Sequence, residues 1–328
     1  MSRIHDALKK AEQERVPAPA AGAVLPADDG FAPDSGGGSN SPVAIAPPAE
    51  KSLVAASMPL LASEGFLRFD DLMARCAHPR WQIDPKVNVF SSGSAGARGA
   101  EQFRTLRSRL YQLRASHSLR TLLVTSAVPA EGKTFVASNL AQAIVRQPDR
   151  RVLIIDADLR CPRLHLPFGA PPAPGLTDYL RGEADEAAVI QCGQGNNLCV
   201  IPGGNEVTDP SELLANGRFA TLLNRVTPVF DWVILDSAPC LPVADSTILA
   251  DFCDAILLVV RAGVTPADLA QRALQELQSR NIAGVVLNAV EETHLYGSYY
   301  YEMYGDAANP RNPQQSRAAA NGQSSRIS

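Results

Sequence analysis

The sequence predicts a doubly wound α/β domain with a mainly parallel sheet. Six short runs rich in Val, Ile and Leu alternate with segments of helical periodicity, and such nearly continuous apolar runs are typical of strands buried on both faces. The predicted strands are 121–126, 152–156, 198–202, 232–236, 255–260 and 284–288. Before the first strand, Phe103, Leu106, Leu110 and Leu113 recur at helical spacing, which predicts a helix over 101–116.

The two ends of the chain differ in composition from the middle. Residues 1–15 have the spacing of a short amphipathic helix, and the residues that follow are rich in Pro, Ala, Gly and Ser. Apolar residues between Leu60 and Leu72 favour a short docking helix there. The predicted organisation is a mostly disordered linker over 16–85, a folded domain over 86–294, a tyrosine cluster over 295–306 and a disordered tail over 307–328.

Composition excludes several classes of protein. The 328 residues carry a net charge of −4, whereas a dedicated nucleic-acid binder usually has a basic excess, so no nucleic-acid partner is expected. No run approaches the ~18 consecutive apolar residues of a membrane span, and the N-terminus lacks the apolar core of a secretory signal. The six cysteines form no CxxC pair and no zinc spacing, so we expect reduced thiols in a cytoplasmic protein.

The strand at 121–126 leads directly into a loop that is typical of a phosphate site. The loop contains Gly132, Lys133 and Thr134 and is followed by a helical pattern, which places backbone N–H groups and a positive helix end around a phosphate chain. Lys133 is expected to reach the β- and γ-phosphates of a nucleotide, and the Thr134 hydroxyl to hold Mg²⁺. Ala127 replaces the first glycine of the GxxxxGK[ST] pattern. An ordinary turn is the alternative, which the flanking strand and helix disfavour.

Three carboxylates stand at the carboxyl ends of predicted strands. Asp156 ends one strand and Asp158 follows two positions later, on the same side of an extended segment, while Asp236 ends another strand. Ligands of open α/β sheets bind at this edge. Each aspartate by itself is also compatible with a cap on the next helix, but three beside a phosphate loop indicate a ligand site.

The segments SAVPAEGKT, VLIIDADLR and VILDSAP together resemble the Walker A, Walker A′ and Walker B motifs of bacterial tyrosine kinases (BY-kinases) of capsule and exopolysaccharide synthesis. The resemblance spans roughly 99–304 and includes EQFRTLRSRL, GLTDYLRG, DPSELLAN and GVVLNAV. Residues 1–15 also resemble the start of relatives encoded with exosortase systems. The resemblance implies an ATP- and Mg²⁺-dependent autokinase that phosphorylates its own C-terminal tyrosines in trans and regulates exopolysaccharide polymerisation and export.

The resemblance also implies roles for individual residues. It implies catalytic roles for Lys133, Asp156, Asp158 and Asp236, and Mg²⁺ contacts from Thr134, Asp156 and Asp236. Either Asp156 or Asp158 takes the tyrosine proton, and the sequence does not say which. The expected nucleotide contacts are Ala130, Glu131, Gly132, Lys133, Thr134, Phe135, Arg160 and Asn288. For Arg160 a structural salt bridge is an equal alternative, and for Asn288 the alternative is a turn cap.

The acceptor tyrosines are expected near the C-terminus. Five of the chain's seven tyrosines lie within nine positions, at Tyr296, Tyr299, Tyr300, Tyr301 and Tyr304. An aromatic edge strand is the alternative, but three consecutive tyrosines would alternate between faces of a strand. In the predicted helix, Glu101, Arg104 and Arg107 match the family's ExxRxxR element, through which subunits dock in a ring; a solvated intrahelical ion pair is the alternative.

Partners follow from the same resemblance. It implies a separate transmembrane polysaccharide co-polymerase adaptor that recruits the protein to the inner face of the plasma membrane, a cognate tyrosine phosphatase, and a ring of unphosphorylated subunits. The alternatives are a ParA/MinD-like ATPase, whose loop carries a lysine at the position of Val128, and a catalytically weak nucleotide-gated scaffold. The loop also departs from the common PGEGK at Ala130; if that position needs a positive φ, alanine costs about 1 kcal/mol and is expected to slow turnover.

Overall fold

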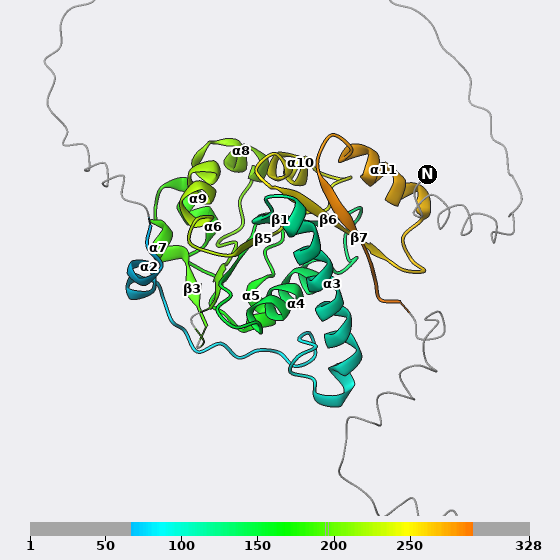
Figure 1. Cartoon of the computed structure of the whole chain (residues 1–328). Helices are drawn as coiled ribbons and strands as arrows, with labels where there is room; N and C mark the ends of the chain where they lie inside the picture. Colours follow the sequence, from blue (N-terminus) through cyan, green and yellow to red (C-terminus); the bar gives the residue numbers. More distant parts are fainter. Residues whose placement is uncertain (1–66, 194, 196, 291–328) are drawn as a thin grey trace, which may run out of the picture. The chain divides into compact units, whose positions relative to one another are not determined.

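The computed structural model describes residues 67–290, except for residues 194 and 196 (Figure 1). The predicted N-terminal helix over 1–15, most of the predicted linker, the tyrosine cluster and the tail lie outside the described residues.

The described residues form a seven-stranded sheet in the order β3-β4-β2-β5-β1-β6-β7. All neighbouring strands are parallel except β3 and β4, which confirms the mainly parallel sheet. The strands are β1 (Thr121–Ser126), β2 (Val152–Asp156), β3 (Gln191–Cys192), β4 (Leu198–Ile201), β5 (Trp232–Asp236), β6 (Ala255–Arg261) and β7 (Ile282–Asn288). Six were predicted, and only the two-residue β3 was not.

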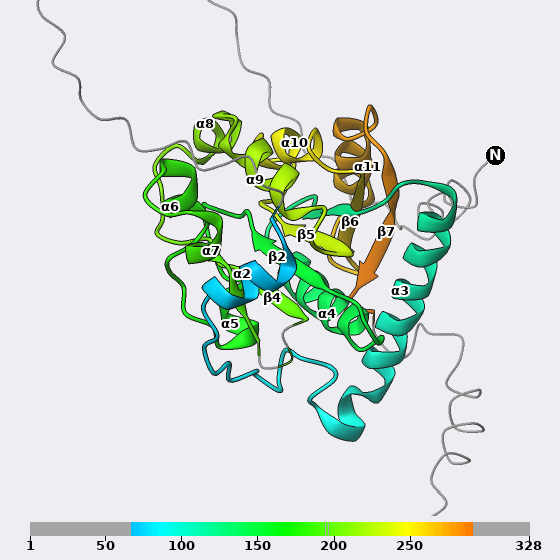
Figure 2. The ribbon, with the colours of Figure 1, turned by 60° about the vertical axis from the view of Figure 1, so that its left-hand side comes forward.

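Helices cover both faces of the sheet, as the continuous apolar strands predict (Figures 1 and 2). One face carries α3 (Ala97–Ser116), which follows the 3-10 turn η1 (Gly93–Gly96), together with α4 (Lys133–Val145) and α5 (His165–Phe168). The other face carries α6 (Leu176–Arg181), α7 (Glu186–Val189), α8 (Pro210–Ala215), α9 (Arg218–Val226), α10 (Asp245–Ala250) and α11 (Ala267–Glu276). In β1, Leu122 and Val124 pack on the first face and Leu123 on the second.

Helix α3 confirms the helix predicted over 101–116 and begins four residues earlier. Phe103 and Leu110 are buried against α4 and the sheet, and Leu106 is partly buried. Leu113, which shares their spacing, is 36% exposed.

A short helix, α2 (Phe69–Arg75), lies where the sequence favours a docking helix. Leu72 is fully buried, and the ring of Phe69 meets that of Phe230 edge to face at 6.0 Å between centroids. Residues 67–85 therefore belong to the packed domain, although the predicted boundary stood at residue 86.

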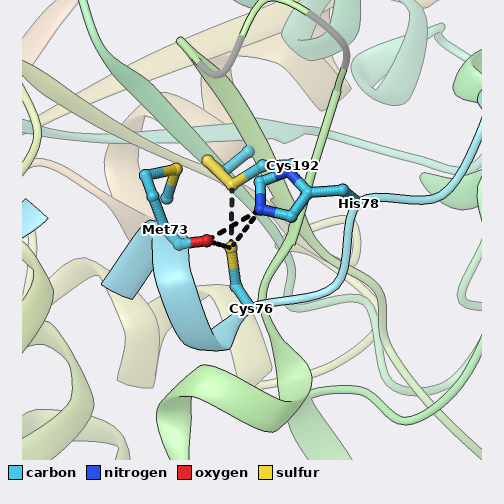
Figure 3. The surroundings of a disulfide bond; sticks show 5 residues. Met73, Cys76, His78 and Cys192 are labelled. Atoms are coloured by element: carbon cyan, nitrogen blue, oxygen red, sulfur yellow. Dashed lines mark hydrogen bonds between the residues drawn. A yellow bond between two sulfur atoms is a disulfide. The ribbon is translucent and has the colours of Figure 1, made fainter. Parts of the chain in front are cut away.

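The expectation of reduced thiols is wrong for one pair of cysteines. Cys192 and Cys199 stand directly opposite each other in the antiparallel β3–β4 pair, with Cα atoms 4.1 Å apart, and form a disulfide. The Sγ of Cys76 lies 3.7 Å from that of Cys192, and His78 lies next to Cys76 (Figure 3). Sequence spacing did not reveal this pair because the short strand β3 that aligns it was not predicted.

Candidate active site

The loop between β1 and α4 has the backbone of a phosphate-binding turn. Gly132, immediately before α4, has φ 91°, and a Cβ there would lie 2.1 Å from Nδ2 of Asn288. Only glycine fits this position. Helix α4 begins at Lys133, so the helix N-terminus and its free N–H groups face the loop.

Ala130 adopts a left-handed conformation with φ 65°. The conditional expectation that this position needs a positive φ is confirmed, and its effect on turnover stays a prediction. A residue with a Cβ is strained by about 1–2 kcal/mol in this region, whereas glycine is not.

We expect Ala130→Gly to raise the free energy of unfolding by up to about 1 kcal/mol, because relief of backbone strain exceeds the greater chain entropy of glycine. Chemical denaturation measures this change. The matched control is Ala127→Gly in the same loop, where the alanine is fully buried and has no positive φ. That control should lower stability. A loss of stability in Ala130→Gly as large as in the control would contradict the prediction.

The predicted site residues converge at the carboxyl edge of the sheet. Asp156 and Asp236 are register partners at the ends of adjacent strands β2 and β5, and both are almost fully buried. The Nζ of Lys133 lies 2.8 Å from Oδ2 of Asp158. The structure therefore places one lysine among three aspartates beside the phosphate loop.

Burial and mutual repulsion perturb these groups. Burial raises the pKa of Asp236 to about 6, although the positive charge of Lys133 and a hydrogen bond from Thr134 oppose the rise. Burial and then the charge of Asp236 raise the pKa of Asp156 well above its usual range. Burial lowers the pKa of Lys133, but the charges of Asp236 and Asp158 outweigh it, so the net pKa is raised. Lys133 therefore stays charged, and the site attracts further cations.

The residues present fit a magnesium ion that arrives with a nucleotide. The Oδ1 atom of Asp236 is buried with no hydrogen-bond partner, and the Thr134 hydroxyl donates to the same carboxylate. Among residues 67–290 no group of three or more His, Cys, Asp or Glu side chains is placed to hold a metal by itself. Mg²⁺ is commonly held by one or two carboxylates plus substrate phosphates and water, which matches this donor set.

Arg160 forms a salt bridge with a buried carboxylate. Its guanidinium contacts the fully buried carboxylate of Asp245 through Nε and Nη2, at 2.7 and 3.0 Å, and also meets the hydroxyl of Ser211. Of the two alternatives for Arg160, the structure favours the salt bridge, because Asp245 would otherwise be a buried unpaired charge.

Two other predicted nucleotide contacts have structural partners. Asn288, at the end of β7, donates through Nδ2 to the backbone oxygen of Glu131 at 2.8 Å, so it holds the phosphate loop. Phe135 packs edge to face on Phe103, with centroids 5.9 Å apart, and thereby joins α4 to α3. A contact with the nucleotide stays a prediction for both residues.

The Glu101–Arg104–Arg107 stripe is divided between two roles. Arg104 and Glu101 form an exposed i,i+3 ion pair at 2.9 Å. Arg107 donates to the backbone oxygen of Ala143 at 2.7 Å and so ties α3 to α4. The interface predicted for the stripe stays a prediction, with Arg104 as its most accessible arginine.

The chain is similar to known nucleotide-binding proteins and kinases. Residues 123–310 match the CobQ/CobB/MinD/ParA nucleotide-binding domain family, which is more than half of the chain. Tyrosine-protein kinase YwqD of Bacillus subtilis is 31% identical over 216 residues, which cover 65% of this chain and 91% of YwqD. The chain belongs to the bacterial tyrosine kinases.

Other members of this kinase family match over a smaller share of their length. Tyrosine-protein kinase etk of Escherichia coli K12 is 37% identical over 58% of this chain, and the match spans 26% of the relative. The succinoglycan biosynthesis transport protein ExoP of Rhizobium meliloti is 34% identical, and the match spans 28% of it. The solved kinase domain of E. coli ETK has a TM-score of 0.55 and 35% identity, covering 60% of this chain and 80% of that domain.

Residues that support this kinase site were also missed by sequence reasoning. Arg261 ends β6 and Thr265 lies in the turn before α11, yet both contact Glu131 of the phosphate loop. No local motif marks them, because they reach the loop only when β6 lies beside β1 in the sheet.

Proposed function

We propose that the chain is an ATP-dependent protein tyrosine autokinase that transfers phosphate to its own C-terminal tyrosines in trans and regulates exopolysaccharide polymerisation and export. The observation that carries this proposal is the group formed by Lys133, Asp156, Asp158 and Asp236 at a phosphate loop. The match to 91% of YwqD supports it further.

The geometry suits phosphoryl transfer, which depends mainly on positioning and charge stabilisation. Lys133 would contact the β- and γ-phosphates of bound ATP, and the N–H groups at the start of α4 would hold the phosphate oxygens. Thr134, Asp156 and Asp236 would hold Mg²⁺, which would neutralise charge on the phosphates. Asp156 or Asp158 accepts the proton of the attacking tyrosine hydroxyl.

The acceptor assignment rests on the difference between the two tyrosines of the folded domain and the five of the C-terminal cluster. Tyr179 is 4% exposed, and Tyr111 packs edge to face on Trp232 at 5.7 Å. Both are therefore poor acceptors, whereas the five tyrosines of the cluster lie beyond the last strand in the sequence.

We expect purified protein incubated with Mg-ATP to gain phosphotyrosine, and simultaneous Phe substitution of the five cluster tyrosines to remove at least nine-tenths of it, since their hydroxyls are the acceptors. The five positions are Tyr296, Tyr299, Tyr300, Tyr301 and Tyr304. Immunoblotting and mass spectrometry measure the outcome, with Tyr179→Phe as the control that leaves phosphorylation unchanged. Phosphate found mainly on Tyr111 or Tyr179 would refute the acceptor assignment. Nucleotide hydrolysis without phosphotyrosine would favour the ParA/MinD-like or scaffold alternative.

The remaining proposals concern partners. We propose a separate membrane co-polymerase adaptor as activator, a cognate tyrosine phosphatase, and a ring of unphosphorylated subunits on the inner face of the membrane. The names of ExoP and of the other relatives support the polysaccharide setting. Within the part of the chain that the structure describes, no helix has the length and hydropathy of a membrane span.

We expect Arg104→Ala to reduce self-association, because this arginine is exposed on the ExxRxxR stripe whereas Arg107 is tied to the backbone of Ala143. Multi-angle light scattering of unphosphorylated protein measures the change. Arg109→Ala, another exposed arginine on α3, serves as the control that keeps the oligomer. An oligomer of unchanged size in Arg104→Ala argues against the interface.

A further inference from the structure

The carboxylate of Glu131 is buried in the phosphate loop and is held from outside the loop. Glu131 is only 2% exposed. One oxygen, Oε2, accepts the backbone N–H of Val128 at 2.8 Å. The other, Oε1, accepts the hydroxyl of Thr265 and the backbone N–H of Arg261, the latter at 3.3 Å. Glu131 therefore bridges the phosphate loop and the turn between β6 and α11.

The same neighbours also hold the backbone of the loop. The Nη1 atom of Arg261 donates to the backbone oxygen of Ala130 at 3.4 Å, and Asn288 donates to that of Glu131. The loop needs such support because Ala130 has a positive φ, which strains a residue that carries a Cβ. A strained backbone persists only where the surroundings hold it in place.

We infer that Thr265 is a positioning residue for nucleotide binding, which acts through Glu131 to keep the phosphate loop in its binding shape. The hydroxyl is the side-chain donor on Oε1, so its loss leaves a buried carboxylate oxygen with one long backbone hydrogen bond. A buried carboxylate oxygen that loses a hydrogen-bond donor is destabilised. A rearrangement of Glu131 that restores a partner would move Val128 and the loop. The inference rests on the proposed binding of ATP by this loop, and not on transfer to tyrosine.

The test is a titration with a fluorescent ATP analogue and Mg²⁺, together with steady-state kinetics in ATP. Thr265→Val should weaken binding about tenfold and raise KM for ATP in proportion, with a smaller change in kcat, because a hydrogen bond to a charged group is lost. Thr265→Ser keeps the hydroxyl and should stay within about twofold of the wild type. Thr221→Val is the matched control, since Thr221 lies on α9 and its hydroxyl donates to the backbone oxygen of Gly217, which is no part of the phosphate loop.

A double-mutant cycle with Glu131→Gln tests whether the two residues act together. The combined loss in Thr265→Val and Glu131→Gln should be smaller than the sum of the single losses, since both disrupt one network. Wild-type affinity in Thr265→Val, equal weakening in Thr265→Ser, or an additive cycle would each overturn the inference. If Thr265→Val does not fold, Thr265→Ala replaces it in the same comparison.

Failure of this inference can be separated from failure of the proposed function. Wild-type protein that binds the ATP analogue but forms no phosphotyrosine would refute the kinase proposal and leave the role of Thr265 intact. Full phosphotyrosine formation with unaltered ATP affinity in Thr265→Val would refute the role of Thr265 and leave the kinase proposal intact.

Discussion

Lys133→Ala should reduce phosphotyrosine formation by at least about a hundredfold, because it removes the positive charge placed to meet the phosphates. The same change should also affect stability, since the structure shows Lys133 paired with Asp158 and surrounded by two further aspartates. Removing the lysine leaves Asp158, with a side chain only 6% exposed, without its cation. Incorporation of phosphate and thermal unfolding measure the two effects.

The effect on stability should depend on pH in a defined direction. The remaining carboxylates repel each other most when ionised, so Lys133→Ala should lower Tm more at pH 8 than at pH 5. Lys86→Ala is the matched control, because Lys86 is exposed and forms no part of the site. It should leave both phosphorylation and Tm unchanged. A folded Lys133→Ala protein with wild-type phosphorylation would exclude Lys133 from the catalytic site.

Asp236→Asn should remove kinase activity and at the same time stabilise the nucleotide-free protein at neutral pH. The pKa of Asp236 is raised from 3.8 to about 6 by burial, so the folded protein binds this proton more tightly than the unfolded chain. Binding of this proton stabilises the fold fully at a pH below 3.8, the pKa of Asp236 in the unfolded chain, and the stabilisation is lost as the pH rises through about 6. Above that pH, ionisation of the buried group costs about 3 kcal/mol.

Asparagine removes this cost, so we expect a gain of about 1–3 kcal/mol in the free energy of unfolding at pH 7.5 and little gain near pH 4. The gain falls toward the lower end of this range to the extent that Lys133 loses its attraction to the charge of Asp236. Urea denaturation at several pH values measures the gain, and Asp251→Asn is a suitable control, since that side chain is 63% exposed. A loss of stability in Asp236→Asn at pH 7.5 would show that Asp236 is not a destabilising charge in the folded protein.

The sequence alone predicted most of the sheet and the chemical type of the site. The runs at 121–126, 152–156 and 232–236 are rich in apolar residues and buried along their whole length, because both faces of these central strands are covered, and this pattern is readable without a structure. The edge differed. Strand β3 has only two residues, too few for a pattern, so its disulfide was predicted as free thiols.

The residues that hold the site together were decided by the tertiary structure. Local sequence patterns mark Lys133 and Asp156, because the strands, the loop and the helix that position them are next to them in the sequence. Thr265 and Arg160 have partners 134 and 85 positions away, which are brought near only when the parallel strands align. Sequence periodicity reports which face a residue occupies, whereas these long-range hydrogen bonds depend on strand order and register. The chain by itself therefore determined where the phosphate loop and its carboxylates lie in the sequence, and only the folded sheet determined which side chains hold the loop in shape.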